Sequence, residues 1–156
     1  MATSALPNAI TQFLAILRAR PALQDGVLIL DGPPVGDVSR ADLIAVGWST
    51  EEDQAGELVQ NFNAAGARTR DEDFSISGVI DAWSGDAEFA VVRERVFALL
   101  GELEDALRAS SSNPEAPTLN GAVLWAHLTR GVLRQYNTDS GVRAALTFTV
   151  TCHARI

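Results

Sequence analysis

Residues 142–156, which read VRAALTFTVTCHARI, show the clearest strand pattern in this sequence. Every even position in the stretch is apolar, and nearly every odd position is polar or charged. This two-residue period is typical of a β-strand with one buried and one solvated face, because successive side chains point to opposite sides of the pleat. At about 3.4 Å per residue the strand would be roughly 50 Å long, well beyond the usual five or six residues. We therefore expect part of it to overhang the domain and to pair with, or rest against, something else.

The segment before this strand is expected to form a hairpin with it. Residues 122–136 are rich in Val, Leu and Trp, but their alternation loses phase around Gly131, which indicates a bulge or bend. Residues 137–141, which read NTDSG, supply turn residues between the two strands.

Two helices are predicted earlier in the chain. The first runs from Pro7, which suits a first helical turn, to about Arg20, and Pro21 ends it. The second runs over residues 87–109 and has the strongest helical pattern in the sequence. Its apolar stripe consists of Phe89, Val92, Val96, Leu99, Leu100, Leu103 and Leu107.

Three further strands are expected, over residues 27–30, 42–48 and 74–83. The first is a short apolar run between turn residues and is interpreted as a buried strand. Residues 49–73 are acidic and poor in large apolar side chains, so we expect an exposed connection with its tip at residues 64–73. The order of elements predicts one α+β domain over residues 1–156, with a mostly antiparallel β-sheet, two helices packed on one face and a long C-terminal β-hairpin.

The composition argues against several classes of protein. The chain has 20 acidic and 12 basic residues, and the basic residues are all Arg and thinly spread, so tight nucleic-acid binding is not expected. A single cysteine, Cys152, allows neither an intrachain disulfide nor a zinc site built from cysteines. The sequence has no secretory signal pattern and no run of about eighteen apolar residues, so we expect a soluble protein made in a cytoplasm, with no membrane partner.

No stretch of the sequence assembles a catalytic site. The Gly-rich residues 31–37 lack a following Gly-Lys-Ser/Thr and a helix start, so they are interpreted as a turn. Cys152 and His153 are neighbours on a strand and point to opposite faces, so Cys152 is expected in the core and not as a nucleophile. His127 and His153 lie on strands that should pair, but two histidines make an incomplete metal site, and we expect a solvated or hydrogen-bonded pair. We therefore predict no enzyme and no cofactor.

The acidic triplet Asp71-Glu72-Asp73 has two interpretations. Strand alternation would place Asp71 and Asp73 on one side, which permits a cation site or paired carboxylates but does not specify one. The flanking Arg68 and Arg70 favour instead a loop of mixed charge that meets a complementary surface. A solvated loop without a partner is the alternative.

The order of several short motifs points to a known family. The motifs cover nearly the whole chain, and they are an amino-terminal helix, Val46-Gly47-Trp48, Arg70 to Ile76, Ala82 to Asp86, Pro117 to Gly121, Gly141, Ala145 to Phe148, and Ala154 to Ile156. In this order they resemble the tail terminator, or tail-completion, proteins of long-tailed bacteriophages that infect actinobacteria.

The resemblance implies a structural virion protein at the junction of tail and neck. It would form a homohexameric ring on the completed tail tube, stop tube polymerisation and contact a head-proximal neck protein. Genomic DNA would pass through an acidic lumen without specific binding, because like charges repel.

The resemblance implies a role in assembly for two sets of residues. The loop would face the lumen or the tube, with Arg68, Arg70, Asp71, Glu72 and Asp73. Changing Arg68 and Arg70 to Glu should then leave the fold intact and weaken assembly with the tube. The spare edge of the last strand would join neighbouring subunits in a ring. Its candidate interface residues are Arg143, Thr147, Thr149, Thr151, His153 and Arg155.

Two other interpretations stay open. A head–tail stopper or adaptor shares much of this order of elements, and it would be distinguished by co-purifying with a portal-side ring in place of the tube protein. A ligand-binding or enzymatic α+β domain would use Asp71, Asp73 and the two histidines. A thermal shift with divalent cations would test that third interpretation, because binding to the folded state raises the melting temperature.

Overall fold

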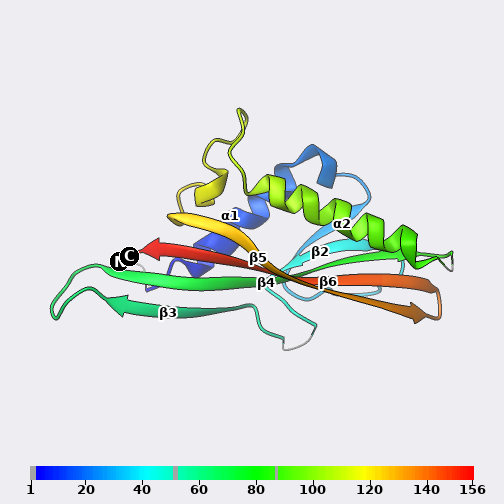
Figure 1. The fold of residues 1–156 in the computed structure, drawn as a ribbon, viewed down its shortest axis with the longest axis horizontal. Helices are drawn as coiled ribbons and strands as arrows, with labels where there is room; N and C mark the ends of the chain where they lie inside the picture. The colour runs from blue at the N-terminus through cyan, green and yellow to red at the C-terminus, as the bar shows by residue number, and fades with distance from the viewer. Residues whose placement is uncertain (1–2, 51–52, 87) are drawn as a thin grey trace.

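The fold is seen in a computed structural model that describes residues 3–50, 53–86 and 88–156 (Figure 1). The α-helices of these residues are α1 (Leu6–Ala19) and α2 (Phe89–Ala106), and short 3₁₀ helices are η1 (Pro21–Leu23) and η2 (Ala116–Thr118). The strands are β1 (Val27–Asp31), β2 (Asp42–Val46), β3 (Gly56–Phe62), β4 (Arg70–Ser84), β5 (Trp125–Thr138) and β6 (Gly141–Arg155).

The strands form one sheet in the order β1-β2-β4-β6-β5, and β3 also pairs with β4. One edge of β4 pairs with β6 along almost its full length. Its other edge is shared by two strands that lie end to end, with β3 on residues 70–76 and β2 on residues 78–81. Every pair is antiparallel except β1 with β2. This is the α+β fold with a mostly antiparallel sheet that the sequence predicts.

Both α-helices pack on the same side of the sheet (Figure 1). The even-numbered residues of β6 from Val142 to Ala154 are all buried, as their alternation predicts. The ring of Phe148 meets that of Phe13 on α1 edge-on, with 6.5 Å between the ring centroids. Full burial of one such side chain contributes about 1.5–3 kcal/mol. The predicted stripe of α2 closes the same core through Val92, Val96, Leu99 and Leu103.

β6 has no spare edge, and this corrects the expectation drawn from its length. Residues 142–155 pair with β4 on one side, and residues 141–153 pair with β5 on the other. β4 has 15 residues and β5 has 14, so the neighbours are about as long as β6 itself. The backbone groups of the long strand are therefore satisfied within the chain.

The predicted C-terminal hairpin is confirmed. β5 and β6 are joined by the two residues Asp139 and Ser140. The register between them shifts between Leu128 and Arg130, close to the bend predicted around Gly131. Such a bulge turns the first part of β5 relative to the rest of the strand.

The sequence predicts one long exposed connection after β2, and the structure shows that this prediction is wrong. Residues 56–62 form the edge strand β3, and β4 begins at Arg70 instead of residue 74. The alternation of β3 is weak because most of its side chains are exposed. Asp71, Glu72 and Asp73 therefore lie in a strand and not in a loop. The prediction of a buried first strand is also wrong, because β1 ends the sheet and its side chains are only partly buried.

Candidate assembly surface

The side of the sheet opposite the two α-helices is termed the open face. Odd-numbered residues of β4 and β6 point to it, because they alternate with the residues that face the helices. Thr147, Thr149, Thr151 and His153 on β6 are half-buried there, and Arg155 is exposed. These predicted interface residues thus project from a face of the sheet, whereas the sequence placed them along a spare edge.

A polar groove of about 520 Å³ lies on the open face. Hydroxyl groups form its floor, from Ser75, Ser77, Thr147 and Thr149. Glu57 on β3 and Arg130 on β5 line it from the two outer strands. The groove therefore spans four neighbouring strands, in the order β3-β4-β6-β5.

Charged side chains pair across β4 and β6 at one end of the open face. His153 Nδ1 lies 2.7 Å from Asp73 Oδ1. Arg155 Nε donates a hydrogen bond of 2.8 Å to Asp71 Oδ1, and this bond lowers the pKa of the Asp71 carboxyl. The structure thus brings together residues that the sequence assigned to two separate surfaces.

The two histidines face the same side, but an indole ring lies between them. The ring of Trp125 stacks on His127 with 5.1 Å between centroids and on His153 with 5.7 Å. Among the described residues, no group of three or more His, Cys, Asp or Glu side chains could hold a metal ion. Asp71, Asp73 and the histidines are engaged with one another, with Arg155 and with Trp125.

Glu72 is a buried structural residue, which corrects its assignment to a partner-binding loop. Its side chain points to the helix side of the sheet and has no exposed surface. One carboxylate oxygen accepts hydrogen bonds from the Ala5 N–H at 2.8 Å and from Ser4 Oγ at 3.0 Å, and the other accepts one from Gln60 Nε2 at 2.5 Å. The negative charge at the amino-terminal end of α1 also complements the helix dipole. Glu72 therefore ties β3, β4 and α1 together.

The two arginines predicted in the loop have different positions. Arg68 is exposed in the connection between β3 and β4. Arg70 lies in β4, where its Nη2 donates to the Thr3 carbonyl oxygen at 2.9 Å and its guanidinium sits 5.7 Å from the centre of the Phe62 ring. Only Arg68 keeps the predicted loop position.

Arg143 is buried, which corrects its assignment to the subunit interface. Its Nε donates to Asp81 Oδ1 at 2.9 Å, and its Nη atoms donate to carbonyl oxygens of Val38, Ser39 and Ala41. Burial raises the pKa of Asp81, against the lowering effect of the hydrogen bond from Arg143. The guanidinium holds the connection between β1 and β2 against the sheet. Because its donors are used in these contacts, the Arg143 side chain is not available to bind another subunit.

Cys152 is a core residue, as predicted. It is fully buried, and burial raises the pKa of its thiol to about 12. A thiol with this pKa is almost entirely protonated at neutral pH and is a poor nucleophile.

None of the helices in the described residues combines the length and the apolar composition needed to cross a membrane.

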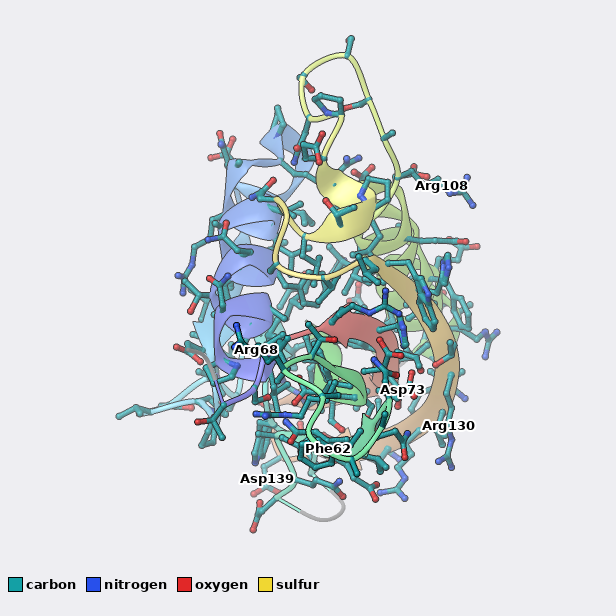
Figure 2. The ribbon with its side chains drawn as sticks, turned by 90° about the vertical axis from the view of Figure 1, so that its left-hand side faces the viewer. Phe62, Arg68, Asp73, Arg108, Arg130 and Asp139 are labelled. Atoms are coloured by element: carbon teal, nitrogen blue, oxygen red, sulfur yellow. The ribbon has the colours of Figure 1, made fainter. Side chains whose placement is uncertain are left out.

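The sequence analysis missed the apolar surface at the outer strands. On β3 the side chains of Leu58, Val59 and Phe62 are 42%, 54% and 68% exposed. At the start of β5, Leu124 and Trp125 are 54% and 37% exposed. Phe62 and Arg130 lie in the lower half of Figure 2, below the helix layer. Val59 and Phe62, whose residue types favour strands, are the signal that could have identified β3.

Comparison with known proteins finds a similar fold among solved structures. No protein-family model matches the sequence, and no curated protein matches it. Among solved structures, a chain from the virion of a native gene transfer agent particle has a similar fold, with a TM-score of 0.56 at 15% sequence identity. The match covers 98% of this chain and 100% of that chain. At this identity the similarity shows a shared fold from end to end.

Proposed function

We propose that this chain is a structural protein of a phage-like virion, and that it forms the ring that ends the tail tube. The observation that carries the proposal is the whole-length match to a chain from a gene transfer agent virion. The match covers almost all of both chains, so the similarity is not confined to one part of either. The order of motifs that resembles tail terminators supports the same assignment.

The surface of the chain supports a role in assembly. Exposed strand edges are templates for pairing with another chain, and exposed apolar side chains mark interaction sites. β3 combines both features. Asp71, Asp73, His153 and Arg155 on the open face are paired with one another, and the one thiol is buried.

The proposed partners follow from the position at the junction of tail and neck. They are further copies of this chain, the tail tube protein and a head-proximal neck protein. With a net charge of −8, a ring of this chain would repel the DNA that passes through it.

The test is to remove the gene from the phage-like element that encodes the chain and to image the particles. Loss of a terminator should give tails of uncontrolled length without heads, and adding the purified chain to polymerising tube protein should limit tube length. Tails of normal length that lack heads would identify a stopper or adaptor instead. Absence of the chain from purified virions would contradict the whole proposal.

A further inference from the structure

We infer that neighbouring copies of this chain join through two particular strand edges, with β3 of one copy pairing with the first part of β5 of the next. The inference rests on the proposed function, because it assumes that copies assemble in a closed ring. It replaces the contact through β6, whose two edges are both occupied within the chain.

Three strands of the described sheet have an edge without a strand partner, namely β1, β3 and β5. The edge of β1 is occupied in part by α1, because Arg18 Nη2 donates to the carbonyl oxygen of Ile29 at 3.3 Å. β3 carries the exposed Leu58, Val59 and Phe62, and β5 begins beside the exposed Leu124 and Trp125. Leu28 on β1 is also 44% exposed, but β3 and β5 are the two edges that combine several exposed apolar side chains with no such helix contact.

The strand directions suit a contact between copies related by rotation. β3, β4, β6 and β5 alternate in direction, so the two outer strands run in opposite directions. A rotation about an axis along the strands preserves each strand's direction and the side on which the helices lie. The β5 of the next copy would thus meet β3 antiparallel, and the alternation would continue across the contact. A head-to-tail contact of this kind closes into a ring when the rotation is right.

One register matches the side chains on both faces of such a pair. With Leu58 opposite Leu128, Phe62 falls opposite Leu124, and these four apolar side chains share one side of the joined sheet. Cβ atoms directly opposite each other in an antiparallel pair lie about 4.5–5.5 Å apart, so the apolar side chains would cover one another. The bulge between Leu128 and Arg130 ends this short ladder.

The charges at the end of this ladder are complementary. In the same register Glu57 falls beside Arg130, just past the bulge. Both side chains are exposed, and neither has a hydrogen bond or ion pair with another described residue. Opposite charges on neighbouring strands stabilise a sheet, whereas like charges destabilise it. Each copy thus offers an acidic group on its β3 edge and a basic group on its β5 edge.

The test uses two single charge reversals and their mixture. Glu57→Arg places two basic groups at every contact, and Arg130→Glu places two acidic groups there. Each variant alone should need at least about tenfold more protein to form rings, because like charges at an interface are strongly unfavourable. An equimolar mixture should form rings as the wild type does, since alternating copies restore an opposite pair at every contact. Glu94→Arg, on the exposed side of α2, is the matched control and should have no effect.

A cysteine pair tests the geometry independently. In the inferred register Val59 lies opposite His127, both on the open-face side. Oxidation of the variant Val59→Cys/His127→Cys should give a ladder of covalently linked copies, with little background because the native Cys152 is buried. Val59→Cys alone should remain uncrosslinked.

The outcomes separate this inference from the proposed function. Ring formation is followed by negative-stain imaging and light scattering, with and without the tail tube protein. Rings that tolerate both reversals, a mixture that fails to recover, or a covalent dimer from Val59→Cys alone would overturn the β3–β5 contact and leave the ring itself intact. A wild-type chain that forms no ring under either condition and does not limit tube length would overturn both.

Discussion

Arg155 on β6 donates from Nε to Oδ1 of Asp71 on β4 over 2.8 Å, and its Nη2 reaches the other carboxylate oxygen at 3.3 Å. The two residues are direct partners in the β4–β6 ladder. This forked contact fixes the ends of two 15-residue strands against each other. It also has a consequence for the pH dependence of stability.

The contact between Asp71 and Arg155 should stabilise the fold except in acid. The hydrogen bond from Arg155 lowers the pKa of Asp71 below the value of about 3.9 expected in the unfolded chain. The stabilisation is therefore present above the unfolded pKa and is lost as the pH falls through the folded pKa. Arg155→Gln should lower the free energy of unfolding at about pH 5 and differ less from the wild type at about pH 2. Urea unfolding at both pH values measures this, and an equal difference at both would contradict it.

Glu72 should be far more important for stability than its neighbour Asp73. Glu72→Ala leaves the Ala5 N–H without its acceptor and removes one of the two acceptors of Gln60 Nε2, which keeps the Thr3 carbonyl oxygen. We expect a cost of about 2–3 kcal/mol in the free energy of unfolding. Asp73→Ala removes only the exposed contact with His153 and should cost less than about 1 kcal/mol. Urea denaturation of both variants tests the difference, which depends on the two side chains pointing to opposite faces of β4. Equal losses would show that the assigned faces are wrong.

Gly78 should tolerate no side chain. A Cβ atom there would overlap the ring of Phe148 and the carbonyl oxygen of Ala45, so Gly78→Ala should lower the free energy of unfolding by about 1–3 kcal/mol. Gly101→Ala is the matched control, because a Cβ on this residue of α2 meets nothing within 4 Å. That change should stabilise the chain by about 0.5–1 kcal/mol, since Ala favours a helix more than Gly does. Thermal unfolding of the two variants would show shifts of opposite sign.

Arg68 and Arg70 should respond differently to the same change. Arg70→Glu breaks the contacts with Thr3 and Phe62 and should lower the melting temperature. Arg68→Glu should leave the melting temperature unchanged, because the residue is exposed in a connection. Under the proposed function it should still weaken binding to the tail tube protein, which a co-sedimentation assay measures. Unchanged binding would remove the connection between β3 and β4 from the proposed partner surface.

The candidate site could be predicted from the sequence only in part. The residues facing away from the core on β6 follow directly from the alternation, which is why Thr147 and Thr149 are found on the open face. Their role could not be predicted in the same way, because the pattern of one strand does not reveal how many neighbours it has. Glu72 was assigned to a loop for a related reason, since a carboxylate in an acidic run gives no sign of the distant Ala5 and Gln60 groups that bury it.

The order of residues was enough to predict where the long strands and helices lie and which of their faces is apolar, as in β6 and α2. These features depend on contacts between near neighbours along the chain, and their period is written in the order of residues. The three-dimensional fold was needed to show that β6 lies between β4 and β5, that β3 is an edge strand, and that Arg143 and Glu72 are buried. Each of these depends on groups brought together from distant parts of the chain, where pairing and burial have no local period.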